Sequence, residues 1–471
     1  METGLTRESV QINDEPPLGA CEKEDVSKPP PSQPAETPAV PILRQHPKWN
    51  DWRWQVQNRI RTFDDLVQFF PALRPHTGIA KVAEKYPMAI TPYYASLVKQ
   101  PDYADPVFQL SVPQVKELYD PDFLHADPLE EEEDMPVPGL VHRYRDRALI
   151  MATTTCSMYC RHCTRKRVAG TQETTISVCQ LDGITNYLHA HPEIKDVIIS
   201  GGDPMTMPTS LLERILTAVR RVGSVEIIRI GTRVPVVLPQ RITAELTQML
   251  AKYHPLWINT HFNHPNEITP ESSAACARLA NAGLPLGNQS VLLRGINDDP
   301  QTMEVLCRQL VRIRVRPYYL FQCDLVRGVE HFRTPISRGI EIMEYLRGRL
   351  SGLAIPTFVV DTPQGGGKIP ILPSYVVSVS PTHTVLRNFE GMMVNYPEPV
   401  EPVRRTVPPP SSKAGSHGVW EMAAGHASSI VPFSAHRQKR RQQRKCQRMA
   451  ASPSHPEFSS LMESLMSEPG Q

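Results

Sequence analysis

Ala148-Leu-Ile-Met-Ala-Thr-Thr-Thr155 runs directly into Cys156-Ser-Met-Tyr-Cys160-Arg-His-Cys163, so an apolar stretch is followed by three closely spaced thiols. The apolar stretch is short and ends in β-branched residues, which predicts a buried strand. Similar runs follow it, and from the second onward they recur about every 30 residues, the length of one βαβ unit. These runs are Val197–Ser200, Val225–Ile230, Leu256–Thr260, Gly287–Leu293 and Val315–Phe321.

Amphipathic helical patterns fill intervals between the predicted strands. Six strand–helix units in succession imply a parallel sheet with right-handed crossovers. Because a closed barrel of this kind needs eight units, we expect an α/β fold with a partial (β/α)6 barrel over residues 141–375. The predicted helices include Leu211–Val222, Ala244–Tyr253, Ser272–Ala282, Met303–Ile313 and Ile336–Leu350.

The segments on either side of the barrel differ from it in composition. Residues 1–45 hold eight prolines and few large apolar side chains, so we expect a disordered N-terminal tail. Residues 46–140 begin with a helical pattern and end near an acidic run, Glu130–Asp134, which we interpret as a solvated loop. Two alternating strands within 376–400 are expected to complete the core. Residues 401–471 are Pro/Ser-rich and then basic, which predicts a disordered tail.

The composition limits the classes of function. The chain has 471 residues with 51 Lys and Arg against 49 Asp and Glu, a formal charge of +2. That balance argues against a general binder of nucleic acid. No apolar run approaches the ~20 residues that cross a bilayer, so we expect no membrane partner. Nine cysteines, three of them within eight residues, indicate a metal or redox site and a reduced compartment, the cytoplasm.

The three crowded cysteines, Cys156, Cys160 and Cys163, form a compact loop at the end of the first predicted strand. A structural zinc site normally needs four ligands, often as two separated pairs, and no second pair exists here. Three thiolates suit a [4Fe–4S] cluster that leaves one iron open for another ligand. We therefore predict an iron–sulfur centre at this loop.

Two glycine-containing stretches are the other candidate ligand sites. Gly201, Gly202 and Asp203 follow the second predicted strand, and the two glycines would let a ligand approach the backbone. Farther along, Asp361-Thr-Pro-Gln-Gly365-Gly-Gly-Lys368 combines three glycines with a lysine. From these residues alone the stretch could be an anion-binding nest, an ordinary turn, or the lysine that holds pyridoxal phosphate (PLP).

The cysteine spacing, together with the glycine pair one unit later, resembles the radical S-adenosylmethionine (SAM) superfamily. Longer ordered motifs over roughly residues 45–400 resemble the lysine 2,3-aminomutase family within it. These motifs are Cys160–Arg167, Thr260–Glu267, Asn288–Gly295, Arg316–Asp324, Glu330–Pro335 and Asp361–Lys368. The resemblance implies a radical-SAM barrel that binds a [4Fe–4S] cluster, SAM and PLP.

The same resemblance implies roles for single residues. Lys368 would be the catalytic Schiff-base lysine, with Arg143, Tyr144 and Arg147 facing PLP and its phosphate. Arg165 would bind the substrate carboxylate, and Asp324 and Asp361 the distal ammonium of a lysine substrate. The residues implied at SAM are Gly201, Gly202, Asp203, His261 and Gln289.

The implied activity is that of an isomerase that interconverts L-lysine and L-β-lysine by radical 2,3-migration of the amino group. The alternatives are arginine 2,3-aminomutase, a relative that modifies a lysine in a protein, and, from another class, a non-catalytic RNA-associated protein using the basic tail. The acid pair argues against glutamate, whose side-chain carboxylate it would repel. The implied partners are a small-molecule amino acid, a reductant such as flavodoxin or ferredoxin, and further copies of the chain in a homo-oligomer.

Overall fold

The computed structural model describes residues 44–363, 365–380, 382–399, 443, 444 and 446. The tails that we predicted over residues 1–45 and 401–471 therefore lie almost wholly outside the described residues. Within the described part, no helix combines the length and the apolar character needed to cross a membrane.

The central sheet has nine strands whose order in space is their order in the sequence. The seven strands from β2 to β8 pair in parallel, while β1 and β9 pair antiparallel at the two edges. Strands β2 to β7 are each followed by at least one helix, so the predicted partial (β/α)6 barrel is confirmed, with β8 added as a seventh parallel strand. The strands are β1 (Leu140–Val141), β2 (Arg147–Thr153), β3 (Asp196–Gly201), β4 (Ile227–Gly231), β5 (Leu256–Thr260), β6 (Leu286–Leu292), β7 (Arg316–Gln322), β8 (Thr357–Thr362) and β9 (Gly367–Pro370).

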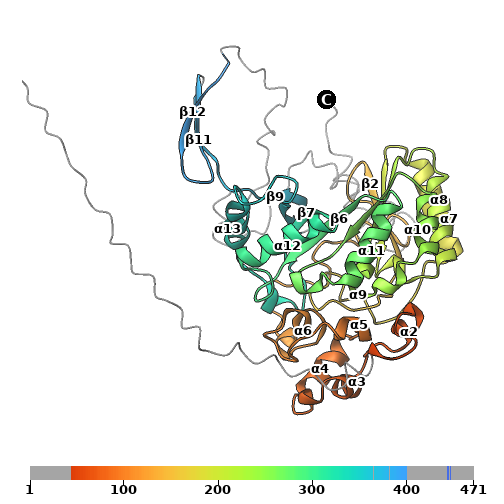
Figure 1. Ribbon diagram of the computed structural model, residues 1–471. Helices are drawn as coiled ribbons and strands as arrows, with labels where there is room; N and C mark the ends of the chain where they lie inside the picture. Colours follow the sequence, from red (N-terminus) through yellow and green to blue (C-terminus); the bar gives the residue numbers. More distant parts are fainter. Residues whose placement is uncertain (1–43, 364, 381, 400–442, 445, 447–471) are drawn as a thin grey trace, which may run out of the picture. The chain divides into compact units, whose positions relative to one another are not determined.

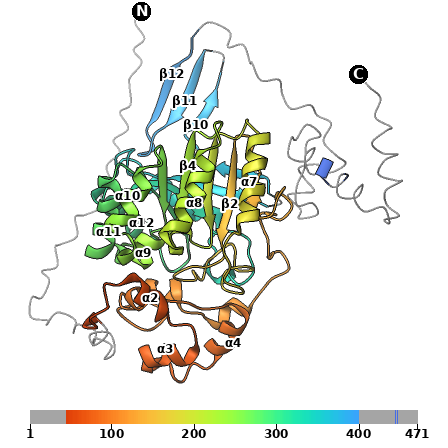
Figure 2. The same ribbon diagram turned by 90° about the vertical axis from the view of Figure 1, so that its right-hand side faces the viewer.

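Helices cover the outside of this sheet, as Figures 1 and 2 show. Their apolar faces bury leucines and isoleucines against the strands, among them Leu216 and Leu279, which are fully buried. The approach is close where α13 crosses β8, because a Cβ at Gly339 would collide with the ring of Phe358. The barrel helices are α7 (Val178–Ala190), α8 (Thr209–Arg220), α9 (Val234–Val237), α10 (Ala244–Ala251), α11 (Pro270–Asn281), α12 (Pro300–Arg312) and α13 (Ile336–Leu346).

The region before the barrel is helical, and it shares the barrel's hydrophobic core. Tyr94 donates its hydroxyl to Glu267 at 2.7 Å, and Tyr93 lies 2.6 Å from Thr269, so both tyrosines join the region to the segment after β5. Its helices are α2 (Trp52–Gln57), α3 (Phe63–Phe69), α4 (Gly78–Lys85), α5 (Pro92–Ala95) and α6 (Pro106–Ser111). Short 3-10 turns occur here and in the barrel loops: η1 (Pro71–Leu73), η2 (Val115–Leu118), η3 (Pro204–Thr206), η4 (Pro239–Arg241), η5 (Pro265–Glu267) and η6 (Glu330–Phe332).

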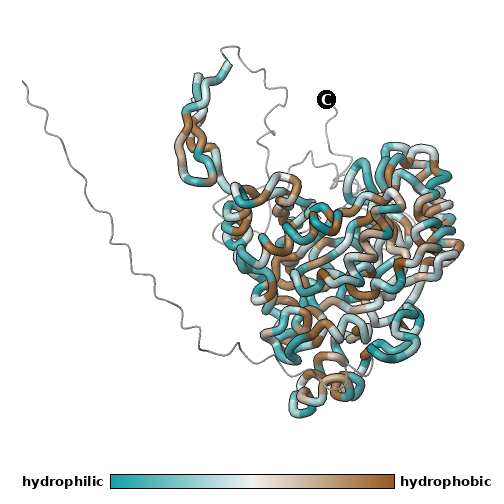
Figure 3. The backbone as a smooth tube through the Cα atoms, in the orientation of Figure 1, coloured by the Kyte–Doolittle hydropathy of each residue, from teal (hydrophilic) through white to brown (hydrophobic). Residues whose placement is uncertain are grey.

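The strands expected to complete the core within residues 376–400 do not do so. They are β10 (Val376–Val379), β11 (His383–Arg387) and β12 (Met393–Pro397), and they form an antiparallel sheet of their own. All side chains of β10 and β12 are exposed, including several large apolar ones. The backbone tube of Figure 3 is brown along parts of this sheet, which marks hydrophobic residues there. An alternating pattern predicts a strand but does not specify what its apolar face packs on, which explains the error.

Candidate active site

The three predicted cluster ligands lie together in the loop that leaves β2. Cys156, Cys160 and Cys163 are free thiols of intermediate exposure, and a turn brings the amide of Cys163 to 3.1 Å from the carbonyl of Cys160. Among the described residues, no three His, Cys, Asp or Glu side chains converge as they would on a single metal ion. Three cysteines in one loop suit the ligation of a [4Fe–4S] cluster that leaves one iron open.

Two arginines that we did not predict support this loop. Arg233, just beyond β4, donates Nη1 to the sulfur of Cys160 at 2.7 Å and pairs with Glu267 at 2.7 Å. Arg59 donates Nη1 to the carbonyl of Cys156 at 2.6 Å. A guanidinium beside a thiolate stabilises its negative charge, so Arg233 adds an electrostatic contribution to the candidate centre. Its position past a strand end was the one sequence signal that could have identified it.

A buried ion triad anchors the other side of the loop. Arg161 Nη2 lies 2.6 Å and Lys166 Nζ 2.7 Å from the same carboxylate oxygen of Glu117. All three side chains are almost fully buried, and Glu117 comes from η2 in the region before the barrel. The loop is therefore held from outside the barrel as well as by β2, which restricts the positions of its thiols.

Gly201 and Gly202 end β3 beside the cysteine loop, as predicted. A Cβ on Gly201 would collide with the carbonyl of Thr153, and one on Gly202 with the carbonyl of Thr155. Gly201 also has a φ of 124°, which favours glycine. The pair is thus required by the close approach of the cysteine loop's own backbone. We predicted that these glycines let a ligand approach the backbone. The close contact with the neighbouring backbone is a second reason for glycine at both positions.

Asp203 is buried and its carboxylate is occupied by the protein. It accepts hydrogen bonds from Thr232 Oγ1 at 2.6 Å, from the amide of Arg233 at 2.6 Å and from the amide of Met205 at 3.1 Å. Burial raises the pKa of Asp203 against these hydrogen bonds, which lower it. In this arrangement Asp203 orients the backbone that carries Arg233.

His261 directly follows β5, and Gln289 lies in the middle of the neighbouring strand β6. His261 Nδ1 is 3.0 Å from the carbonyl of Gln289, so this nitrogen carries the proton and Nε2 is an acceptor. Burial, with the charge of Arg233, lowers the pKa of His261 to about 4. A neutral imidazole with a free lone pair can accept a hydrogen bond from a ligand at the cluster.

Lys368 is in strand β9, directly opposite Asp361 in β8, and not in a flexible loop. Its Nζ lies 3.1 Å from Asp361 Oδ2, and its amide donates to the hydroxyl of Tyr144 at 2.9 Å. The guanidinium of Arg147 stacks 4.3 Å from the ring centre of Tyr144. The buried Nε of Arg147 makes no hydrogen bond within the described residues, but it lies 3.5 Å from Asp146 Oδ1, so its charge is already partly paired.

The residues predicted to hold the two ends of the substrate are adjacent to the cysteine loop. Thr164 donates its hydroxyl to Asp324 Oδ2 at 2.7 Å, and Arg165, the next residue, donates Nη1 to the carbonyl of Gly201 at 3.2 Å. Burial and then the charge of Asp361 raise the pKa of Asp324 to about 7. Asp324, Asp361 and Arg165 thus form one continuous group with the cysteine loop and with Lys368.

The acidic run was interpreted wrongly as a solvated loop. Glu131 and Asp134 are 5% and 1% exposed, because each pairs with an arginine of the predicted site. Glu131 lies 2.7 Å from Arg165 Nη2, and Asp134 3.2 Å from Arg143 Nε. A run of like charges in a sequence does not reveal partners that fold onto it from elsewhere in the chain.

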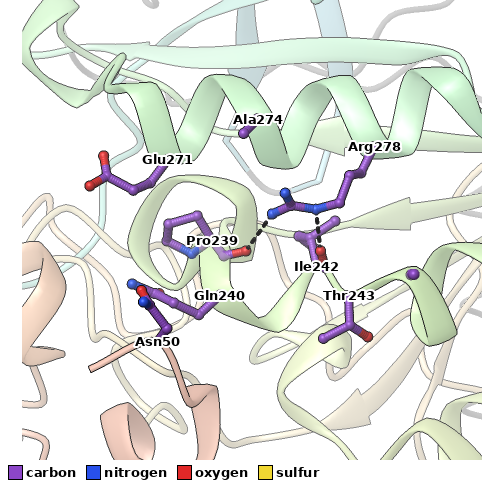
Figure 4. Close-up of a pocket in the computed structure, with 9 residues that line it drawn as sticks. Asn50, Pro239, Gln240, Ile242, Thr243, Glu271, Ala274 and Arg278 are labelled. Carbon is purple, nitrogen blue, oxygen red and sulfur yellow. Dashed lines mark hydrogen bonds between the residues drawn. The ribbon is translucent and has the colours of Figure 1, made fainter. Parts of the chain in front are cut away.

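A surface pocket of about 430 Å³ lies apart from these residues, between η4, the start of α10 and α11 (Figure 4). Arg278 donates to the carbonyl of Ile242 at 2.6 Å on its wall. None of the residues predicted for the active site lines it. Several of the predicted site residues lie at or just past the C-terminal ends of strands, where barrel enzymes place their sites: the three cysteines, Gly201, His261 and Asp324.

Two family models match the chain. A sequence model described as the radical SAM superfamily matches residues 150–306, and one described as lysine-2,3-aminomutase matches residues 343–456. The second match extends past residue 400, where we had expected the likeness to end.

Individual relatives cover most of the chain. An L-lysine 2,3-aminomutase of Clostridium subterminale is 50% identical over 83% of this chain and 95% of its own length. One from Fusobacterium nucleatum is 53% identical over 75% of this chain and 83% of its own. A glutamate 2,3-aminomutase of Clostridioides difficile is 45% identical over 76% and 85%.

Proposed function

The chain belongs to the lysine 2,3-aminomutase family, and we propose that it is the isomerase that interconverts L-lysine and L-β-lysine by moving the amino group between C2 and C3. Identity alone does not assign the substrate, because a glutamate 2,3-aminomutase is nearly as similar as the lysine enzymes. The observation that carries the assignment is the half-buried pair of carboxylates Asp324 and Asp361. Two carboxylates at one end of the site attract a cationic side chain and repel an anionic one.

Three ligands fit the arrangement of the site. The [4Fe–4S] cluster and SAM supply the radical that starts the migration, and PLP supplies the delocalisation that lets the amino group move. Cys156, Cys160 and Cys163 would hold the cluster. Gly201, Gly202 and the free lone pair of His261 Nε2 would face SAM, together with the side chain of Gln289.

PLP would be held at the opposite end of the site. Lys368 would bind it covalently, and Arg143, Tyr144 and Arg147 would surround its ring and phosphate. The guanidinium groups of Arg143 and Arg147 suit a dianion there, although Asp134 and Asp146 lie within ion-pair distance of them. The ring of Phe321 lies 5.4 Å from Lys368 Nζ and bounds the same space.

The protein's own residues would orient the substrate between these cofactors. Arg165 would bind the α-carboxylate through paired N–H groups, and Asp324 with Asp361 would hold the distal ammonium. Fixing both ends sets which hydrogen of the substrate faces SAM, and it keeps the reacting carbons in place through the migration. Lys368, beside Asp361, would hold PLP next to the proposed substrate residues.

We also propose a reductant such as flavodoxin or ferredoxin, which the cluster requires, and a homo-oligomer. The exposed apolar side chains of β10 and β12 support association with another surface. Eight cysteines in the described part of the chain are free thiols, which supports a reducing compartment such as the cytoplasm.

The assignment can be tested by anaerobic reconstitution with iron, sulfide, PLP and SAM, followed by reduction. L-lysine, L-arginine and L-glutamate are then supplied in separate reactions, and products are identified by NMR and mass spectrometry. We expect L-β-lysine from lysine and no product from glutamate. Rearrangement of arginine but not of lysine would replace the proposed substrate with the longer cation.

A further inference from the structure

Both carboxylate oxygens of Glu131 accept hydrogen bonds from one edge of the guanidinium of Arg165. Its Oε1 lies 3.2 Å from Arg165 Nε and 2.7 Å from Nη2, and its Oε2 lies 3.0 Å from Nε. This is the paired geometry that carboxylates form with the Nε and Nη2 side of an arginine. The edge used by Glu131 is therefore closed to any other carboxylate.

The Nη1–Nη2 edge of Arg165 still has N–H groups available for hydrogen bonds to another ligand. Of its five N–H groups, Nε–H and one on Nη2 go to Glu131, and one on Nη1 goes to the carbonyl of Gly201 at 3.2 Å. The remaining contact of Nη1, to Ser200 Oγ, is 3.5 Å and too long to count as a firm hydrogen bond. One N–H on Nη1 and one on Nη2 thus remain for a second carboxylate.

Glu131 is itself held firmly. Its side chain is 7% exposed, and Arg167 Nη2 lies 3.4 Å from its Oε2. Burial opposes its ionisation, but the charges and hydrogen bonds of Arg165 and Arg167 bring the pKa of Glu131 down to about 2. Glu131 is therefore an anion at neutral pH, where its ion pair with Arg165 is retained.

We propose that Glu131 is a positioning residue that fixes the orientation of Arg165, so that its Nη1–Nη2 edge receives the substrate carboxylate. The inference rests on the proposed function, in which Arg165 binds that carboxylate. Without Glu131, the guanidinium would rotate among several rotamers and would meet the substrate in one geometry only part of the time. Glu131 thereby acts on substrate binding and not on radical formation.

The test is Glu131→Gln in the reconstituted holoenzyme. We expect KM for L-lysine to rise about tenfold with kcat nearly unchanged, the pattern for lost binding that is uniform between ground and transition states. The dissociation constant of lysine, measured by calorimetry with the cluster left unreduced, should rise by the same factor. Glu132→Gln is the matched control, because this neighbouring carboxylate is 71% exposed and pairs with Arg167 alone.

A ligand without a carboxylate separates orientation from general damage. The diamine 1,5-diaminopentane is lysine without that group, so its affinity should not change in Glu131→Gln. Equal weakening of the diamine and of lysine, or unchanged lysine affinity, would overturn the inference. If the glutamine variant does not fold, Glu131→Asp provides the same comparison, because its shorter side chain cannot reach both nitrogens. A wild type that leaves lysine unchanged would instead overturn the proposed function.

Discussion

Lys368 Nζ lies 3.1 Å from Asp361 Oδ2, and the two residues are directly opposite each other across the β8–β9 hairpin. An ammonium group therefore already occupies one of the two carboxylates proposed to bind the distal ammonium of the substrate. The carboxylate of Asp361 is 5% exposed, so little water competes for it. The pairing is consistent with the proposal that Asp361 binds a primary ammonium, and it places Lys368 next to the proposed substrate site.

Replacing Lys368 by alanine should abolish covalent binding of PLP and leave the cluster intact. Borohydride reduction of the wild type, followed by peptide mass spectrometry, should find the pyridoxyl label on Lys368. In Lys368→Ala the label and the catalytic activity should be lost, while iron content stays at the wild-type level. Lys252→Ala is the control, because this lysine is 63% exposed at the end of α10 and pairs with Glu213. A label on any other lysine of the wild type would contradict the assignment.

Asp324→Asn should impair lysine binding much more than SAM cleavage. The amide keeps the shape of the side chain but removes the charge that would meet the substrate ammonium. A charge-assisted hydrogen bond contributes about 1.5–3 kcal/mol, so KM for lysine should rise about 10- to 100-fold. Reductive cleavage of SAM by dithionite, measured without lysine, should stay near the wild-type rate. Unchanged lysine kinetics would remove Asp324 from the substrate site.

The pH dependence of kcat/KM for lysine should also reflect the ionisation of Asp324. Burial and the neighbouring charge of Asp361 raise the pKa of Asp324 to about 7, whereas Thr164 and Lys368 act in the opposite direction. Below that pH Asp324 gains a proton and loses its attraction for an ammonium. In the wild type, kcat/KM for lysine should therefore fall up to tenfold per pH unit below about 7. In Asp324→Asn this fall should disappear, and a fall that persists would point to another group.

The barrel could be predicted from the sequence because strand–helix repeats are local signals, each contained within one unit of the chain. The sites at Asp324, Asp361 and His261 could be placed for the same reason, since parallel strands bring their carboxyl ends to one edge. The sheet of β10 to β12 could not be placed, because the packing of an apolar strand face depends on contacts that its own pattern does not contain.

The residues that were missed act through distant contacts. Glu131 and its partner Arg165 are 34 residues apart in the sequence. Arg233 and Cys160 are 73 residues apart, and Thr164 and Asp324 are 160 apart. Nothing in the local pattern around Glu131 distinguishes it from a surface acid of the same run. The partner of a charged residue is known only from the folded structure. There, the acids of this run that pair with arginines are buried and belong to the predicted site.

Substitution of single cysteines should separate the proposed cluster ligands from the other thiols of the chain. Cys163→Ser removes one of three thiolates, and a hydroxyl is a poor ligand for iron in such clusters. We expect anaerobically reconstituted Cys163→Ser to lose most of its iron, its absorption near the visible range typical of iron–sulfur proteins, and all SAM cleavage. Cys179→Ser is the matched control, because this thiol is exposed in the first turn of α7 and is outside the loop. It should retain wild-type iron content and activity. If Cys163→Ser kept a full complement of iron while Cys179→Ser lost it, the centre would lie elsewhere, and the roles assigned to Arg233 and Gly201 would fail with it.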